Sequence, residues 1–124
     1  IYDAANPEKP EYMFEKTGSL PSGKNIEVLL KREFNAFQDT KLDEKLKSKN
    51  AKVLLISGLE LGFCVKETVE DALSRGYRIY MVEDLICHWP DGESEFKQYA
   101  RQNYDDRVCF VSSNDVKRAL KPAA

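Results

Sequence analysis

Short apolar runs alternate with segments of helical spacing through the second half of the chain. Three of these runs are typical of buried strands: "KVLLIS", "RIYMVED" and "RVCFVS". Each is followed by a segment in which apolar residues recur at helical spacing, over residues 64–76, 92–103 and 113–120. Repeated strand–helix units predict a mostly parallel sheet with helices on both faces. The pattern therefore predicts a three-layer α/β/α fold.

The first half of the chain is less regular. Residues 1–25 are rich in proline and glycine and predict a long loop. Next, "IEVLLK" (26–31) is expected to form a short strand, and "DTKLDEKLKSKN" (39–50) a helix. Because 124 residues suffice for one hydrophobic core but not for two, we expect a single domain over residues 1–124.

Two of the predicted helices have candidate capping residues at their starts. Asp39 or Thr40 is expected to cap the helix over 39–50, and Ser113 or Asn114 the closing helix. Short polar side chains at these positions can accept hydrogen bonds from the first backbone N–H groups of a helix, which have no partner within the helix.

Composition and charge argue against several classes of function, among them binding to nucleic acid and to membranes. The net charge is −2 and residues of both signs are interspersed, so no patch for nucleic acid or an anionic membrane is visible. No apolar run approaches the roughly 18 residues of a membrane span, and no signal-peptide pattern opens the chain. The first residue is isoleucine, which fits a processed or trimmed chain. The sequence lacks a G-x-G-x-x-G turn, so we expect no dinucleotide, and we expect no other cofactor.

The cysteines indicate a reducing compartment. There are three, an odd number without a C-x-x-C pair, and His88 is the only histidine. We therefore expect free thiols, no metal site and an intracellular protein, either cytoplasmic or organellar. Cys109 lies in an apolar run and is expected to be buried and inert. Cys87 adjoins His88, but adjacent side chains of an extended segment point to opposite faces.

Cys64 stands where a predicted strand turns into a helix, just behind Gly58 and Gly62. In an open parallel sheet, ligands bind beyond the carboxyl ends of the strands. The unpaired N–H groups and the dipole at a helix N-terminus favour a thiolate there and can hold a developing oxyanion. The position alone fits a nucleophile and a small packed residue equally well.

A thiol nucleophile needs a partner that withdraws its proton or stabilises its charge. His88 and Lys31 both follow predicted strands, so both are expected at the same sheet edge as Cys64. Lys31 also fits the simpler role of a polar residue that ends a strand.

Other side chains near Cys64 have plain structural interpretations. Four charged residues of the following helix are expected to form a solvated face: Lys66, Glu67, Glu70 and Asp71. Four aromatic residues fit either a substrate pocket or the core: Phe34, Phe37, Phe63 and Trp89.

Two segments carry a resemblance to a known family. "KREFNAFQDTKLDEKL" followed by "VLLISGLELGFCVKETVEDALSRGYRIYMVED" resembles the isochorismatase-like cysteine hydrolase superfamily, which includes isochorismatases, nicotinamidases and N-carbamoyl amide hydrolases. The resemblance runs from about residue 28 to residue 84. It implies that Cys64 attacks a small amide, carbamoyl or isochorismate-like substrate and that Lys31 stabilises the thiolate. It also implies an oxyanion hole at the backbone of Glu60 and Cys64, with a cis peptide bond at Leu59–Glu60.

The departures from the family pattern concern its aspartate and its metal. The aspartate of the family's triad ends the first strand, and no segment here resembles that strand, so the resemblance begins at the family's second strand. Stand-ins within this chain are Asp3, Glu60 and Asp84. The histidine that nicotinamidases use for a metal falls at Ala5, which again predicts no metal.

Two functions follow from the resemblance. One is a cysteine hydrolase of a small-molecule substrate, favoured by the retention of both Cys64 and Lys31. The other is a catalytically impaired relative that serves as a structural subunit of a larger assembly. We expect the place of the missing strand to be filled by an unobserved part of this protein, by a rearranged N-terminus, or by a second copy in a homo-oligomer or a partner chain.

Overall fold

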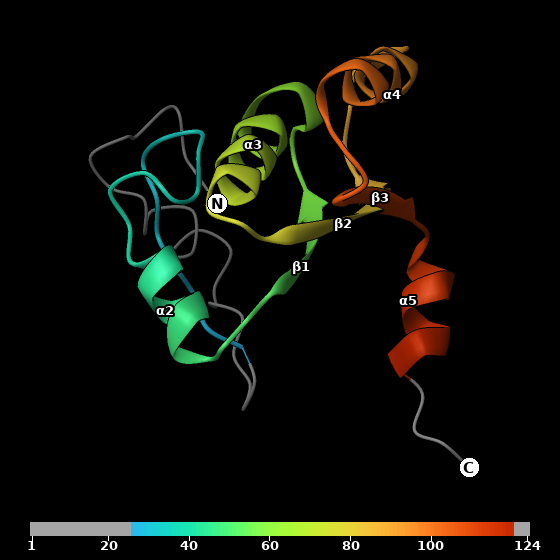
Figure 1. Cartoon of the computed structure of the whole chain (residues 1–124). Coiled ribbons are helices and arrows are strands. Elements are labelled where there is room, and N and C mark those ends of the chain that lie inside the picture. Colours follow the sequence, from blue (N-terminus) through green and yellow to red (C-terminus); the bar gives the residue numbers. More distant parts are fainter. Residues whose placement is uncertain (1–25, 121–124) are drawn as a thin grey trace, which may run out of the picture.

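A single parallel sheet forms the centre of the computed structural model, which describes residues 26–120 (Figure 1). Its strands lie in the order β1–β2–β3, with β1 at Val53–Gly58, β2 at Arg78–Ile86 and β3 at Val108–Val111. Both pairings are parallel. The three strands predicted in the second half of the chain and their parallel arrangement are therefore confirmed.

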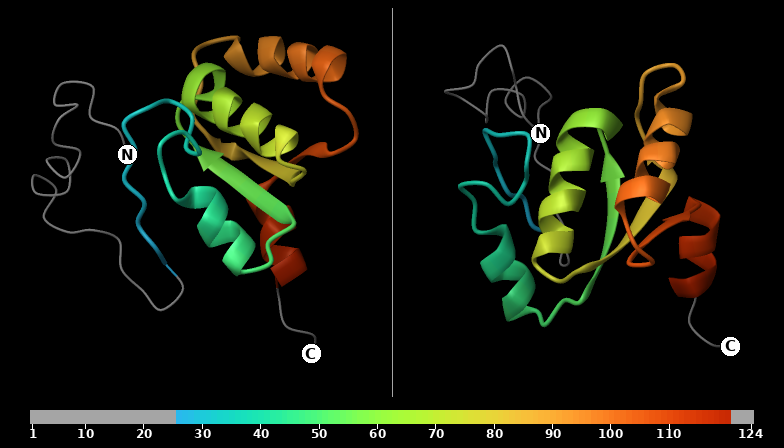
Figure 2. Two further views of the ribbon diagram at one scale, coloured as in Figure 1. Left: turned by 60° about the vertical axis from the view of Figure 1, so that its left-hand side comes forward. Right: turned by 45° about the horizontal axis from the view of Figure 1, so that its top comes forward.

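Helices cover both faces of this sheet. Beyond β1 lie a π-helical turn, η1 (Leu61–Val65), and α3 (Lys66–Ser74); the other helices are α2 (Leu42–Ser48), α4 (Gly92–Asn103) and α5 (Ser113–Leu120). Figure 2 shows α3 and α4 side by side over one face and α5 on the other. The predicted three-layer α/β class is confirmed. None of the helices between residues 26 and 120 is long and apolar enough to cross a membrane.

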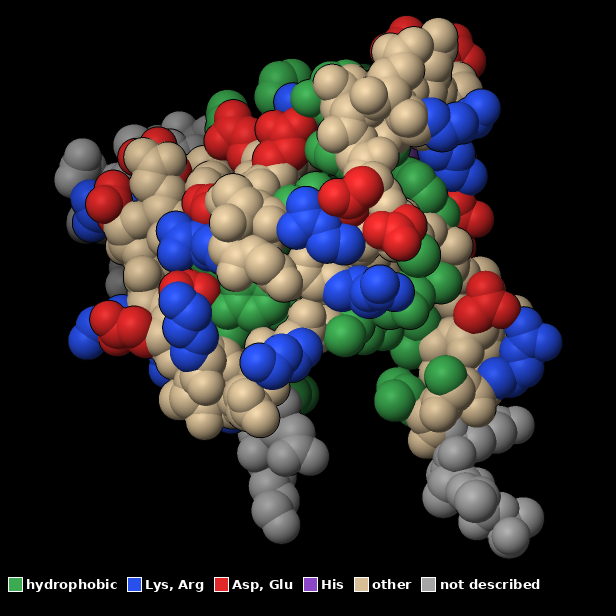
Figure 3. Space-filling view, viewed as in Figure 1, with side chains coloured by type: hydrophobic (Ala, Val, Ile, Leu, Met, Phe, Trp, Pro, Cys, Tyr) green, Lys and Arg blue, Asp and Glu red, His purple; other side chains and the backbone are tan. Residues whose placement is uncertain are grey.

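The core lies between the sheet and α3. Alternate residues of a strand point to opposite faces, so Ile79 and Met81 of β2 turn toward Val69 of α3, and all three are fully buried. On the opposite face, side chains of β1 and α5 line an apolar groove of about 360 Å³. Val53 and Leu55 of β1 line this groove and are themselves partly exposed. Figure 3 shows hydrophobic side chains gathered where α5 meets the sheet.

The strand predicted at 26–31 is wrong. Residues 26–31 form no strand in the described part of the chain, and Ile26 and Val28 are exposed. An apolar run becomes a strand only where a neighbouring strand can pair with its backbone. Here β1 lies at an edge of the described sheet and pairs only with β2.

The predicted caps are corrected. The helix α2 begins at Leu42 and its N-cap is Lys41, without a side-chain capping bond, so neither Asp39 nor Thr40 is the cap; the Thr40 hydroxyl only accepts from the Leu42 N–H, at 3.3 Å. At α5 the capping residue is Ser112, not Ser113 or Asn114. Its hydroxyl accepts from the backbone N–H of Asp115 at 3.1 Å, and the Asp115 carboxylate accepts from the backbone N–H of Ser112 at 3.0 Å. Because Ser112 directly follows an apolar run, the sequence pattern assigns it to the end of the preceding strand.

Candidate active site

The chain turns sharply between β1 and the segment that carries Cys64. β1 ends at Gly58, whose φ of 114° is readily adopted only by glycine. The next peptide bond but one, Leu59–Glu60, is cis, as predicted. The Gly58 carbonyl accepts from the Cys87 N–H at 2.9 Å, and the Cys87 carbonyl accepts from the Leu61 N–H at 2.9 Å. The turn is therefore anchored to the end of β2.

Cys64 lies within η1 rather than in regular α-helix. The Glu60 carbonyl accepts from the N–H of Val65, five residues later, at 3.1 Å, which is the bond of a π-turn. The Glu60 carboxylate accepts from the Gly62 N–H at 3.3 Å. Leu61 and Val65, each 4% exposed, hold the turn in the core. Cys64 is half-buried and α3 begins two residues later, so its predicted position at the start of the helix is confirmed.

Lys31 lies in the loop before α2. Its ammonium donates to the carbonyls of Glu33 at 2.8 Å and Phe34 at 3.1 Å. The Phe34 ring lies 6.0 Å, centroid to centroid, from the ring of Phe63, the neighbour of Cys64. Among the described residues no hydrogen bond joins the Lys31 ammonium to the Cys64 sulfur. The segments that carry these two side chains contact each other through the rings of Phe34 and Phe63.

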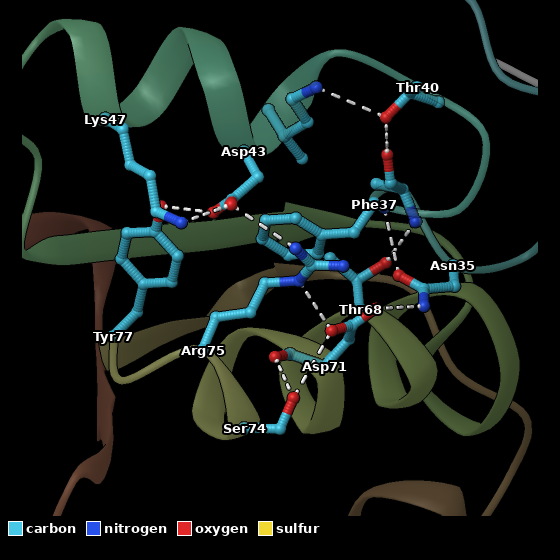
Figure 4. A network of polar contacts seen from close by, with 12 residues as sticks. Asn35, Phe37, Thr40, Asp43, Lys47, Thr68, Asp71, Ser74, Arg75 and Tyr77 are labelled. Atoms are coloured by element: carbon cyan, nitrogen blue, oxygen red, sulfur yellow. Dashed lines mark hydrogen bonds and ion pairs between the residues drawn. The ribbon is translucent and has the colours of Figure 1, made fainter.

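Polar side chains of α3 bind the loop that follows Lys31 (Figure 4). The Thr68 hydroxyl accepts from the Ala36 N–H at 3.0 Å, and the Asp71 carboxylate accepts from the Asn35 amide at 2.6 Å. Arg75 also donates to Asp71, at 2.7 Å. Burial alone would raise the pKa of Asp71, but the hydrogen bonds from Arg75 and Asn35 outweigh it and lower this pKa. The predicted solvated role of Asp71 is wrong.

A second polar cluster joins α3 to α4. The Glu70 carboxylate accepts from the hydroxyls of Tyr99 at 2.8 Å and Tyr104 at 3.0 Å, and the Lys66 ammonium lies 3.1 Å away. Burial alone would raise the pKa of Glu70, but these donors outweigh it and lower this pKa. Burial, and then the Glu70 carboxylate, raise the pKa of Tyr104. Of the four charged residues expected to be solvated, Glu67 alone is simply exposed.

The aromatic candidates divide between a groove and the core. Phe63 and Trp89, both exposed, line a groove of about 280 Å³ between η1 and α4, together with Glu60. Phe37 is 4% exposed and stacks on Tyr77, with ring centroids 6.1 Å apart. Phe37 therefore belongs to the core.

The remaining candidates lie away from Cys64 or have other contacts. His88 contacts the Trp89 carbonyl at 3.0 Å and lies 3.5 Å from the Glu93 carboxylate. The Asp84 carboxylate accepts from the hydroxyl and N–H of Ser113, which lower the pKa of Asp84. Cys109, expected to be buried, is half-exposed. Asp3 and Ala5 lie outside the described residues. Within residues 26–120 no three His, Cys, Asp or Glu side chains form a group that could hold a metal ion.

Comparison with known proteins identifies the family. A sequence profile of the isochorismatase domain matches residues 17–115. The chain belongs to the isochorismatase family. Over 88 residues it is 30% identical to an N-carbamoylsarcosine amidase of an Arthrobacter species, and this match covers 71% of the chain and 32% of the amidase. The chain thus spans about a third of that relative.

Solved structures of relatives share this fold. The N-carbamoylsarcosine amidase from Thermoplasma acidophilum superposes with a TM-score of 0.69 at 25% identity, over 91% of this chain and 68% of that one. The nicotinamidase from Bacillus subtilis superposes with a TM-score of 0.64 at 25% identity, over 82% of this chain and 53% of that one.

In the sequence of this isochorismatase-family chain, Thr68 falls within the segment that carries the resemblance and Asp71 is expected on a solvated face. Their spacing of three residues, on one helix face, was the available signal that both contact the same neighbour. The neighbour itself, the loop at 35–36, is more than 30 residues away in the sequence and becomes visible only in the folded chain.

Proposed function

We propose that this chain carries the cysteine and lysine of an amide-hydrolysing site, with Cys64 as nucleophile and Lys31 as the cation that stabilises its thiolate. The observation that carries the proposal is a half-buried cysteine in the turn just beyond the carboxyl end of β1. The family match includes both residues. Further support is the Phe34–Phe63 contact, which brings the Lys31 loop against the Cys64 turn.

The chemistry proceeds in two displacements. The Cys64 sulfur attacks the carbonyl carbon of the substrate, the C–N bond breaks, and the leaving nitrogen takes the proton that the thiol gave up and departs as ammonia or an amine. Water then attacks the thioester, releases the acid and restores the thiol. Lys31 relays the proton between the sulfur and the leaving nitrogen.

The carbonyl oxygen becomes negatively charged during each displacement. The backbone N–H groups of Glu60 and Cys64 form the oxyanion hole. In support, the Glu60 N–H donates no hydrogen bond within the described residues, so it is available to a substrate. The groove beside the turn, with Phe63 and Trp89 on its walls, holds part of the substrate.

The substrate is a small amide or carbamoyl compound. Support comes from the relatives, whose names specify N-carbamoylsarcosine and nicotinamide as substrates. The aspartate implied by the resemblance is assigned to no residue of this chain, because Asp84 is bound by Ser113 and Glu60 caps η1. β1 is an edge of the described sheet, so a further strand along it can come from another part of the protein, a second copy or a partner chain.

The test measures how fast Cys64 reacts with iodoacetamide, a neutral reagent that Lys31 does not attract. Cys87→Ser and Cys109→Ser leave Cys64 as the only thiol. A cation about 4–6 Å from a thiol raises its thiolate fraction about tenfold below the thiol pKa, and the lower basicity offsets about threefold of this gain. Lys31→Met should therefore slow alkylation at pH 6–7 about threefold. Lys52→Met, at an exposed lysine, should not change it.

Hydrolysis is measured alongside as ammonia release from nicotinamide and N-carbamoylsarcosine, with Cys64→Ser as the inactive control. Alkylation that is no faster than that of free cysteine and does not depend on Lys31 contradicts the proposal. That result would leave a family fold kept as a structural subunit.

A further inference from the structure

We propose that Thr68 and Asp71 are positioning residues, which act on the chemistry by holding the Lys31 loop against α3, the helix that directly follows the Cys64 turn. This role rests on the proposed function, because it concerns the placement of Lys31 relative to Cys64. It assigns a purpose to two polar side chains that neither the thiol chemistry nor the core uses.

The loop from Lys31 to Phe37 lacks the support that a strand would give. Residues 26–31 form no strand in the described part of the chain, so backbone ladders do not fix this loop. Side chains fix it instead. The Ala36 N–H donates to Thr68 and the Asn35 amide donates to Asp71, while the Asn35 carbonyl oxygen accepts from the Phe37 N–H at 3.0 Å. Asn35 is thus held at both ends of its amide.

Both anchors lie close to the nucleophile. Thr68 comes four residues after Cys64, one helical turn along α3, and Asp71 follows one turn later. Both lie on the helix face that meets the loop, as Figure 4 shows for Thr68, Asp71 and Asn35. A shift of α3 relative to the loop would therefore move Cys64 and Lys31 relative to each other.

The connection continues from the anchors to the Lys31 ammonium. Residue 34 precedes the anchored residues Asn35 and Ala36, and its carbonyl accepts from Lys31 at 3.1 Å. Its ring contacts Phe63 at 6.0 Å. The segment that holds the ammonium is therefore attached on one side to η1 and on the other to α3. Loss of one anchor would remove one of these two attachments.

Arg75 supports the Asp71 anchor from behind. Its guanidinium donates to Asp71 at 2.7 Å, lies 3.3 Å from the Asp43 carboxylate of α2, and stacks 4.9 Å from the centre of the Phe37 ring. Asp71 is therefore ionised and held in one orientation, with its second oxygen directed at Asn35.

A positioning role differs from a purely structural one in how it depends on Lys31. If Thr68 acts through Lys31, its removal affects Cys64 only while Lys31 is present. A purely structural role would alter the Cys64 turn with or without Lys31. A double-mutant cycle on the reactivity of Cys64 separates the two.

The experiment uses the chain with Cys64 as its only thiol and measures the rate constant of iodoacetamide alkylation at pH 6–7. Thr68→Val removes the acceptor of the Ala36 N–H at nearly constant shape, and Thr68→Ser keeps it. We expect Thr68→Val to slow alkylation by about twofold to threefold, approaching the Lys31→Met rate. Thr68→Ser should keep the parent rate. In the Lys31→Met background, Thr68→Val should have no further effect, although it lowers the melting temperature in both backgrounds.

Asn35→Ala, which acts from the loop side, is the second variant should Thr68→Val fail to fold, and it should reproduce the same cycle. An equal slowing by either variant with and without Lys31, or no slowing at all, overturns the positioning role alone. A parent rate that does not depend on Lys31 overturns the proposed function, and the positioning role with it.

Discussion

Replacing Tyr104 by phenylalanine removes one of three donors to the Glu70 carboxylate and tests whether this carboxylate is a charged link between α3 and α4. The Tyr104 hydroxyl donates to Glu70 at 3.0 Å. A hydrogen bond to a charged group contributes about 1.5–3 kcal/mol. Tyr99 and Lys66 remain as partners of Glu70, and the Glu70 side chain is 36% exposed. Both facts favour the lower end of this energy range. We expect Tyr104→Phe to lower the free energy of unfolding by about 1.5 kcal/mol at pH 7, or the melting temperature by about 5 °C.

The pH dependence provides a second, independent test. Burial alone would raise the pKa of Glu70, but Tyr99, Lys66 and Tyr104 hold it below its usual 4.5. A carboxylate whose folded pKa is depressed stabilises the fold above its unfolded pKa, and this contribution is lost as the pH falls through the folded pKa. Tyr104→Phe removes one cause of the depression. The difference in stability between parent and variant should therefore shrink as the pH falls through the folded pKa of Glu70, which lies below 4.5.

Urea unfolding at a series of pH values, from pH 7 down to the lowest pH at which the parent remains folded, measures both effects. Tyr80→Phe is the matched control, because the Tyr80 hydroxyl makes no hydrogen bond within residues 26–120. The reasoning is refuted if the free-energy cost of Tyr104→Phe is the same at every pH of this series. It is refuted equally if the cost persists in a Glu70→Gln background, where the charged acceptor is gone.

Urea unfolding at pH 7 also tests two local backbone features. Ser112→Ala should lower the free energy of unfolding by about 1 kcal/mol, because the Asp115 N–H loses its side-chain acceptor, whereas Asn114→Ala should change it by less than about 0.5 kcal/mol; similar losses would mean that Ser112 is not the cap. Gly76→Ala should cost about 1–2 kcal/mol, because φ is 91° there although no atom lies within 4 Å of the added Cβ. Gly62→Ala, whose Cβ would lie 3.8 Å from Glu60, should cost less, and equal costs would contradict this account.

The sequence predicts those elements whose signal is local. The helices at 92–103 and 113–120 have the predicted bounds, because an apolar stripe, flanking polar residues and a short connection all lie within one stretch of chain. The run at 26–31 has an equally apolar pattern but forms no strand. Within residues 26–120 no strand pairs with this run, and a local pattern contains no information about such pairing.

The candidate site likewise contains features that have a local signal in the sequence and features that do not. The position of Cys64 and the cis bond before it follow from residues near it in the sequence and from the resemblance they carry. Glu70 and Asp71 look like solvated charges because their partners are distant in sequence. Tyr99 lies 29 residues after Glu70, and Asn35 lies 36 residues before Asp71. A sequence pattern predicts that a charged residue on a helix is exposed to solvent, because it does not show that the fold brings such a donor to the residue.

The residues that carry the family resemblance therefore do two different things. Cys64 and Lys31 are the groups that the proposed chemistry uses, whereas Asn35, Thr68 and Asp71 hold one segment against another. A match to the second group is evidence for the loop geometry, and it would persist in a relative without activity. What ties the two groups together is the dependence of Cys64 on Thr68 through Lys31. Measuring that dependence therefore asks whether this geometry of the fold serves a reaction.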